Sequence, residues 1–235
     1  MPAPTFGELC AMAGAIYNDN DAVTQEMNQT VSANGWTAKP FPAGTSGFQA
    51  GLFTRGTDTV VAFRGTVPSN TGDLVADLKL GLGMNTSHFA QGEAVLSQLK
   101  GQNVTLTGHS LGGAIAQIVG NRARLPFVTF NAPGVAVLAS RNIYTANPAV
   151  LGVRLAGAAA SAVFSPGQAW SDIKSAFHKV RGVNVCLMGD PVSLYGVHYG
   201  KVIRLLGMGH GIGNVAKVLA TSSTRSETVD THFPT

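Results

Sequence analysis

The chain has 235 residues, of which 45% are hydrophobic and 12% charged, with 29 glycines and a formal net charge of +4 at pH 7. This length suits one medium-sized domain with a substantial core. The basic residues are scattered, without the clusters and interleaved aromatic side chains typical of nucleic-acid binding, so we expect no nucleic-acid partner. The low charge density favours a surface that is partly apolar or that meets an apolar phase.

The two cysteines, Cys10 and Cys186, have neither the spacing of a metal site nor the density of a disulfide framework. Buried free thiols are expected, with a Cys10–Cys186 disulfide as the alternative. The first residues lack the basic region and apolar core of a secretory signal, and the sequence is compatible with a mature form. No uncharged apolar run reaches the length of a membrane span, so a soluble or peripheral protein is expected.

The first half of the chain contains helical patterns on either side of a predicted hairpin, as judged from apolar spacing and turn residues. Thr5 is the expected N-cap of the first helix. The predicted elements are a helix over 5–18, a more polar helix or loop over 18–29, strands over 47–54 and 59–66, and helices over 73–80 and 87–100.

In the second half, short apolar strands alternate with helices. The predicted elements are strands over 104–107 and 127–134, a helix over 111–123, a helical insert over about 136–182, strands over 183–189 and 201–206, a helix over 212–219, and a polar tail over 222–235 that frays. This alternation predicts the α/β class, with a mainly parallel sheet covered by helices on both faces. A single domain over 1–235 is expected to hold all of these elements.

The central motif is Gly108-His109-Ser110-Leu111-Gly112, which lies between a predicted strand and a predicted helix. A turn this tight holds its middle residue in a strained conformation, and glycines on either side give the needed clearance. The turn would raise the Ser110 hydroxyl above the carboxyl edge of the sheet. The N-terminus of the next helix would offer the Leu111 N–H to a developing oxyanion.

A serine nucleophile needs a histidine base, and the base needs a carboxylate that fixes its tautomer. On sheets of this type the chain order is nucleophile, acid, base. Asp190 directly follows the strand over 183–189, at the edge of the sheet where reactive groups gather, so it is the candidate acid. The alternative is a turn-forming role before Pro191.

Three histidines follow Asp190, namely His198, His210 and His232. His210 comes just after the strand over 201–206, on the expected edge of Ser110, and is the candidate base. His198 precedes that strand, and His232 is the alternative base. His109 is expected to pack or to form a hydrogen bond under the turn rather than to act as the base, because adjacent side chains point apart.

A second oxyanion donor should come from the loop after an earlier strand. Thr66 ends the strand pattern over 59–66 and offers both an N–H and a hydroxyl. Arg64 is expected to be a buried, paired arginine that anchors this loop, rather than a substrate ligand.

Together these segments resemble the class 3 lipases, the family of the fungal triacylglycerol lipases and their bacterial relatives. The matching segments, in family order, are 60–66 (VVAFRGT), 73–78 (DLVADL), 105–116 (TLTGHSLGGAIA), 127–133 and 190–192 (DPV). The resemblance implies an α/β-hydrolase fold with catalytic Ser110, Asp190 and His210, an oxyanion donor at Thr66, and a lid near 69–78. The insert over 136–182 is longer than in that family, and it is the alternative location of the lid.

We therefore predict a serine carboxylester hydrolase, a lipase or esterase, that cleaves acylglycerols or other lipid esters through an acyl-enzyme on Ser110. Its expected partners are lipid substrates at a lipid–water interface or membrane surface, and the reaction requires no metal and no cofactor. One alternative is a phospholipase A, acting on membrane glycerophospholipids as a secreted effector that uses a signal-independent route. The other is a catalytically silent module of the same fold that binds lipid or protein.

Overall fold

The computed structural model describes residues 2–17, 19–41, 47–65, 86–99, 103–136 and 180–233. Several predictions from the sequence lie outside these residues. They are the helix over 73–80, the oxyanion donor Thr66, the lid near 69–78 and nearly all of the insert over 136–182.

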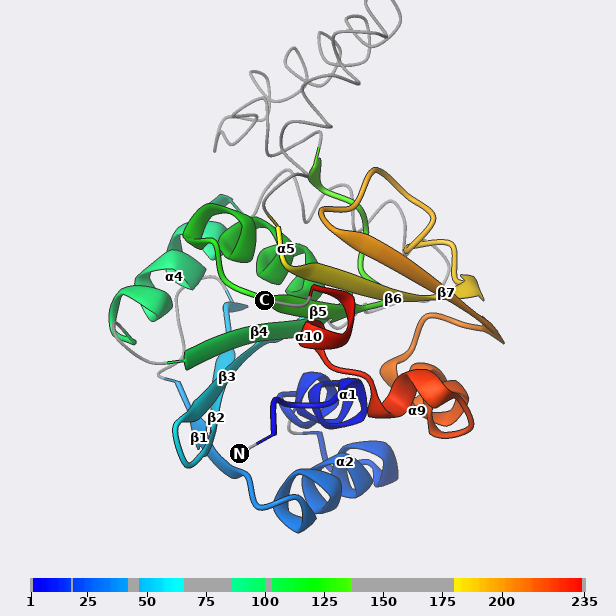
Figure 1. Cartoon of the computed structure of the whole chain (residues 1–235), viewed down its shortest axis with the longest axis horizontal. Helices are drawn as coiled ribbons and strands as arrows, with labels where there is room; N and C mark the ends of the chain where they lie inside the picture. Colours follow the sequence, from blue (N-terminus) through cyan, green and yellow to red (C-terminus); the bar gives the residue numbers. More distant parts are fainter. Residues whose placement is uncertain are drawn as a thin grey trace, which may run out of the picture.

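A sheet whose strands follow one another in chain order forms the centre of the described structure (Figure 1). Its strands are β1 (Thr37–Pro40), β2 (Ala50–Arg55), β3 (Asp58–Phe63), β4 (Asn103–His109), β5 (Phe127–Phe130), β6 (Gly182–Gly189) and β7 (Lys201–Met208). The first three strands pair antiparallel, and β3 to β7 pair parallel. The predicted mainly parallel sheet and the hairpin of β2 and β3 are therefore confirmed.

Helices cover both faces of this sheet, as predicted (Figure 1). One face packs against α4 (Thr86–Ser97) and α5 (Leu111–Ala123), and the other against α1 (Phe6–Ala15), α2 (Ala22–Ala33) and α9 (Ile212–Ala220). Alternate residues of β3 show the two cores: Val61 and Phe63 join the α4 and α5 side, whereas Val60 and Ala62 join the α1 side. This is the period of two that a strand buried on both faces requires.

Thr5 caps α1, as its sequence predicts. Its hydroxyl accepts from the Glu8 N–H, and the Glu8 carboxylate accepts from the Thr5 N–H. The Glu8 carboxylate also accepts from Trp36 Nε1 at 3.1 Å and from Arg55 Nη1 at 2.5 Å. The guanidinium of Arg55 lies 4.2 Å from the centre of the Trp36 ring. This cluster attaches α1 to the antiparallel end of the sheet.

The prediction that the tail over 222–235 frays is wrong for its described residues. The tail forms a short 3-10 helix, η3 (Ser223–Ser226), and α10 (Val229–His232). Val229 is buried, Thr228 pairs with Thr5 in an isolated bridge, and the His232 ring stacks on Phe6 at 5.6 Å. The tail is held because its few apolar residues pack on α1.

The strand β1 was not predicted, since its sequence Thr-Ala-Lys-Pro carries no apolar alternation.

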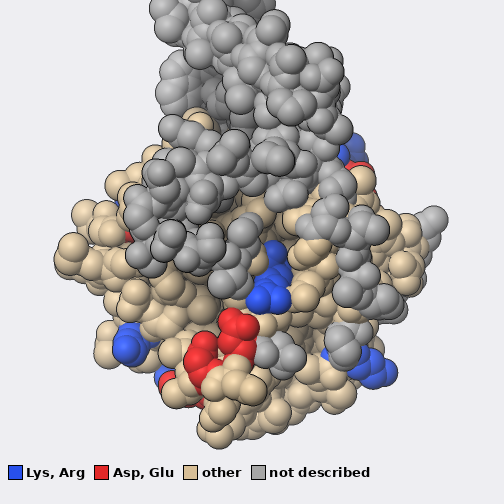
Figure 2. Space-filling view, turned by 180° about the vertical axis from the view of Figure 1, so that it is seen from behind, with Lys and Arg blue, Asp and Glu red and all other residues tan. Residues whose placement is uncertain are grey.

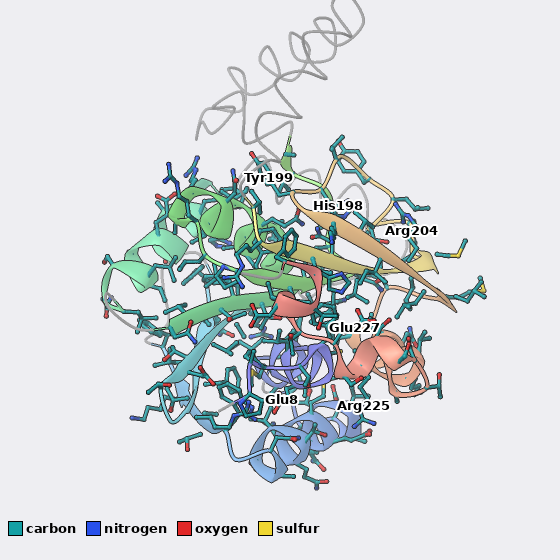
Figure 3. All side chains as sticks on the ribbon, in the orientation of Figure 1. Glu8, His198, Tyr199, Arg204, Arg225 and Glu227 are labelled. Atoms are coloured by element: carbon teal, nitrogen blue, oxygen red, sulfur yellow. The ribbon has the colours of Figure 1, made fainter. Side chains whose placement is uncertain are left out.

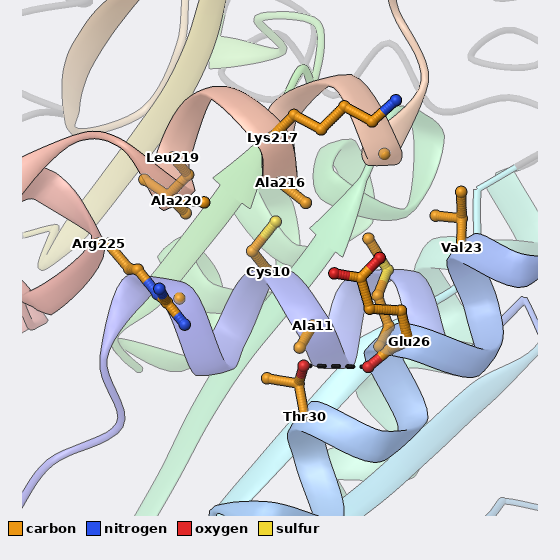
Figure 4. A pocket seen from close by; sticks show the side chains of 13 residues that line it. Cys10, Ala11, Val23, Glu26, Thr30, Ala216, Lys217, Leu219, Ala220 and Arg225 are labelled. Carbon is orange, nitrogen blue, oxygen red and sulfur yellow. Dashed lines mark hydrogen bonds between the residues drawn. The ribbon is translucent and has the colours of Figure 1, made fainter.

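Charged side chains are sparse on the face shown in Figure 2, where small basic and acidic groups lie among uncharged residues. A groove of about 310 Å³ lies between α1, α2, α9 and η3 (Figure 4). Its lining includes Cys10, Glu26, Lys217 and Arg225, and it contains none of the residues predicted to be catalytic.

Candidate active site

Ser110 lies at the turn between β4 and α5 and has φ 57° and ψ −128°, a strained backbone conformation for a residue with a side chain. The flanking glycines are required by close backbone contacts. A Cβ on Gly108 would lie 2.5 Å from the Gly112 carbonyl carbon, and one on Gly112 would lie 2.0 Å from the Phe63 carbonyl oxygen. The strand-turn-helix predicted around the serine is therefore present, with its glycines at the positions where a side chain would clash.

The structure brings the three predicted triad residues together. His210 Nε2 lies 2.8 Å from Ser110 Oγ, and His210 Nδ1 lies 3.0 Å from Asp190 Oδ1. Ser110 follows β4, Asp190 follows β6, and His210 comes shortly after β7, so all three gather at the carboxyl edge of parallel strands. This is the geometry in which a base takes the serine proton while a carboxylate fixes its tautomer.

Asp190 is fully buried, and the turn that follows it holds its carboxylate in place. Oδ1 accepts from the Val192 N–H at 3.1 Å, and Oδ2 accepts from the Ser193 N–H at 3.0 Å. Asp190 therefore forms the turn before Ser193 and also contacts His210, so its place in the turn does not exclude its proposed role as the acid. A carboxylate fixed in this way can orient the imidazole without moving itself.

His210 lies in a glycine-rich loop, and two side chains from other elements hold its backbone. Asn131, just after β5, donates from Nδ2 to the carbonyls of Gly209 at 3.1 Å and His210 at 3.0 Å. His109 Nε2 lies 2.8 Å from the same His210 carbonyl. On its other side, His109 Nδ1 lies 2.9 Å from the hydroxyl of Tyr17, at the end of α1.

The environment of His109 keeps its imidazole neutral. Burial, helped by the neighbouring His210, lowers the pKa of His109 to about 3. The two rings lie 4.7 Å apart between centroids, so two positive charges there would repel each other. His109 therefore packs and forms hydrogen bonds under the turn, as expected from the sequence, and does not serve as a base.

The other two candidate histidines have partners away from Ser110. His198 Nε2 lies 2.8 Å from the Ala132 carbonyl and 4.0 Å from Cys186 Sγ, and burial lowers its pKa. Figure 3 shows His198 and Tyr199 across the sheet from Glu8. His232 Nε2 lies 2.6 Å from Glu227 Oε2. Of these histidines, His210 is the one that faces Ser110.

One of the two expected oxyanion donors lies in the described residues. Leu111 begins α5, so its N–H is one of the first-turn donors that a helix leaves without an intrahelical acceptor. Thr66 lies outside the described residues, but Gly65 before it passes close to the nucleophile, since a Cβ on Gly65 would lie 3.3 Å from Ser110 Cβ. Arg64 donates to Gln49 Oε1 and lies 3.7 Å from Asp19, so it is paired, as predicted. The prediction that it is buried is wrong, because its side chain is 21% exposed.

Tyr17 and Asn131 are residues of the site that the sequence analysis did not find. Asn131 had a partial signal, as an asparagine within the strand pattern predicted over 127–134. The structure ends β5 at Phe130 and gives Asn131 a φ of 44°, which suits asparagine. Tyr17 had none, since it follows a helix that is distant in the sequence from every catalytic segment.

Cys10 and Cys186 are buried free thiols, so the disulfide alternative is wrong. Burial raises the pKa of Cys10 to about 12 and that of Cys186 to about 11.

Among the described residues no cluster of His, Cys, Asp or Glu has the arrangement of a metal site. In the same part of the chain, no helix is long and apolar enough to cross a membrane.

Comparison with known proteins gives the family of this chain. Residues 9–164 match the model of the phospholipase-like family, described as a Tle-like phospholipase domain. The extracellular phospholipase A1 of Serratia liquefaciens is 33% identical over 93 residues, which cover 38% of this chain and 28% of that relative. The chain thus matches less than a third of that relative's length.

Solved lipases cover much of the chain at low identity. The triacylglycerol lipase of Penicillium expansum is 13% identical, with a TM-score of 0.42 over 94% of this chain and 87% of that one. Lipase II of Rhizopus niveus is 15% identical, with a TM-score of 0.40 over 80% of this chain and 72% of that one.

Proposed function

Since the chain belongs to the phospholipase-like family through its Tle-like phospholipase domain, we propose that it is a serine carboxylester hydrolase of lipid substrates, with Ser110 as nucleophile. Its α/β-hydrolase fold places the serine on a strained turn at the carboxyl edge of the sheet. The observation that carries the proposal is the continuous set of contacts from Asp190 through His210 to Ser110.

The first chemical step forms a bond between Ser110 Oγ and the ester carbonyl carbon, while His210 Nε2 takes the hydroxyl proton. Negative charge then moves onto the carbonyl oxygen. The Leu111 N–H at the start of α5 is the proposed donor to this oxygen, and Thr66, outside the described residues, is the proposed second donor. Asp190 stabilises the positive charge on His210, and burial of its carboxylate strengthens this attraction.

Collapse of the tetrahedral intermediate breaks the bond to the alcohol, which leaves with the proton from His210. The acyl group stays on Ser110 as an ester. Water then attacks this ester, giving up its proton to His210, and the same steps release the carboxylic acid and restore the serine. The reaction balances with substrate and water alone.

A glycerophospholipid is the second candidate substrate class beside acylglycerols, favoured by the match to a phospholipase domain over 9–164. Both classes present the same carboxylic ester to Ser110, and they differ in the group on the alcohol side. The separating measurement is the rate of fatty-acid release from phosphatidylglycerol vesicles compared with tributyrin emulsion. A higher rate on the vesicles supports a phospholipase A, and a higher rate on tributyrin supports an acylglycerol lipase.

The hydrolase proposal itself is tested with p-nitrophenyl esters of increasing chain length. We expect turnover by the wild type and a loss of turnover in both Ser110→Ala and His210→Ala. Loss in Ser110→Ala with full activity in His210→Ala would reassign the base to another histidine. An inert wild type that also fails to react with a fluorophosphonate would favour the silent binding module.

A further inference from the structure

The loop that carries the base has little rigidity of its own. The segment Gly207-Met-Gly-His-Gly211 covers the last two residues of β7 and the start of this loop, and Gly209 has φ 90°, a conformation that other residues rarely adopt. The imidazole of His210 must nonetheless stay within hydrogen-bond distance of Ser110 Oγ. The required rigidity must therefore come from contacts made by other elements.

The His210 carbonyl receives two such contacts from buried side chains. Asn131 Nδ2 donates to it at 3.0 Å, and Asn131 Oδ1 accepts from the Leu187 N–H at 2.8 Å, so this side chain links the loop to β6. His109 Nε2 reaches the same carbonyl at 2.8 Å. His109 is 5% exposed and Asn131 is fully buried, so water does not replace these bonds without a structural change.

The direction of each hydrogen bond follows from the chemistry of the groups. A carbonyl only accepts, so His109 must carry its proton on Nε2. Because the ring is neutral, its Nδ1 is an acceptor, and the Tyr17 hydroxyl donates to it. The Tyr17 oxygen in turn accepts from the backbone N–H of Gly65. The chain of donors therefore runs from Gly65 through Tyr17 to His109, and His109 donates to the His210 loop.

We propose that Tyr17, His109 and Asn131 are positioning residues for the esterase reaction, which fix the His210 loop and the end of β3 relative to the turn that carries Ser110. This inference rests on the proposed function. None of the three touches the reacting atoms: they act through the His210 backbone and, for Tyr17, through Gly65 next to the oxyanion candidate Thr66.

The inference is tested by removing single hydrogen bonds. Tyr17→Phe deletes only the hydroxyl, and His109→Leu deletes both ring nitrogens. His109→Gln restores an N–H donor near the position of Nε2. Thr129→Val is the matched control, because it removes a buried hydrogen bond of β5, 2.6 Å to Asn184, that does not reach the His210 loop.

Each variant is assayed on p-nitrophenyl butyrate, and kcat is expressed per active site titrated with a fluorophosphonate. We expect kcat to fall about 10- to 100-fold in His109→Leu and by a smaller factor in Tyr17→Phe, with little change in KM, because a misplaced base costs rate rather than binding. His109→Gln should recover most of the loss. Thr129→Val should lower the melting temperature and leave kcat per site unchanged. Asn131→Gly, which keeps the positive φ, should lower kcat in the same way as His109→Leu.

The inference is overturned if His109→Leu and Tyr17→Phe keep the wild-type kcat per titrated site, or if the loss in His109→Leu is no greater than in Thr129→Val. A second measurement does not depend on activity. Nitrogen-15 NMR of the histidine rings should show His109 as the Nε2–H tautomer, without titration between pH 5 and 8. An Nδ1–H tautomer or a titration in that range overturns the network, whereas an inert wild type overturns the proposed function instead.

Discussion

The imidazole of His210 lies 2.8 Å from the hydroxyl of Ser110, although 100 positions separate the two residues in the chain. The parallel strands β4 and β7 bring them together, because both residues follow strands that end at the same edge of the sheet. Asp190 completes the contact from the end of β6, the strand between β5 and β7. The chemistry of the site thus depends on sheet topology.

Replacing Asp190 with asparagine tests the role of the buried carboxylate. The amide introduced by Asp190→Asn keeps one of the two oxygens that accept from the Val192 and Ser193 N–H groups, and it would let the imidazole adopt the wrong tautomer. We therefore expect kcat to fall on the order of 10³- to 10⁴-fold. The measurement is kcat on a soluble p-nitrophenyl ester. Asp230→Asn is the control, since Asp230 is paired with Arg181 at the surface and should be dispensable. A kcat close to that of the wild type in Asp190→Asn would assign the acid elsewhere.

The Glu8 cluster predicts a change in stability rather than in catalysis. Glu8 and Arg55 side chains are 9% and 14% exposed, and Glu8→Gln would leave the arginine without its anion. Losing one partner of a buried pair costs about 3 kcal/mol in the free energy of unfolding. Urea denaturation measures this cost, and Glu26→Gln on the exposed face of α2 is the control. Equal midpoints for the two variants would contradict the structural role of the cluster.

The Glu8 pair also gives stability a dependence on acid. Burial raises the pKa of Glu8, but the hydrogen bonds from Thr5 and Trp36 and the charge of Arg55 outweigh it and leave the pKa below its usual value. A lowered folded-state pKa stabilises the protein above the unfolded pKa, near 4.5, and this contribution is lost as the pH falls. Glu8→Gln should therefore lose less stability than the wild type when the pH is lowered from 5 to 3.

His109 also makes the free energy of unfolding depend on pH, over a higher pH range than Glu8 does. Its pKa falls from about 6.5 in the unfolded chain to about 3 in the folded protein, so below pH 6.5 the unfolded state binds one more proton. The free energy of unfolding should then decrease by about 1.4 kcal/mol per pH unit as the pH drops toward 3. The His109→Gln variant has no imidazole at this position, so its free energy of unfolding should lack this dependence on pH. If the difference in unfolding free energy between wild type and variant were independent of pH, His109 would not be a buried neutral imidazole.

The two thiols offer a test of the core. Cys10 and Cys186 are unpaired and buried, with raised pKa values. A disulfide reagent should therefore react with neither thiol in the native protein and with both after denaturation. Absorbance of the released thiolate counts them without any variant. Denatured protein that releases no signal would indicate a disulfide.

Sequence reasoning selected three residues that the structure brings together, because the constraints on them are either local or set by their order along the chain. Glycines at 108 and 112 are fixed by contacts within the turn, and the order of Ser110, Asp190 and His210 follows from strand succession. The capped helix α1 and the hairpin of β2 and β3 were found for the same reason, because their signals lie within a few residues.

Features that arise from tertiary contacts were missed. Tyr17 meets His109 across 92 positions, and no spacing rule connects them. The tail was expected to fray because it is polar, yet Val229 and the His232 ring dock on α1, and this contact is visible only once α1 is placed. The edge strand β1 forms by pairing with β2, a partner that its own sequence does not indicate.

The most direct test of Ser110 as an activated nucleophile is the rate at which a fluorophosphonate labels it, followed by mass spectrometry of the intact protein and of its peptides. We expect one adduct per wild-type chain, located on Ser110, and labelling slowed by about 10³-fold or more in His210→Ala, because the serine then lacks its base. Labelling at another residue, or at an equal rate in His210→Ala, would contradict this role.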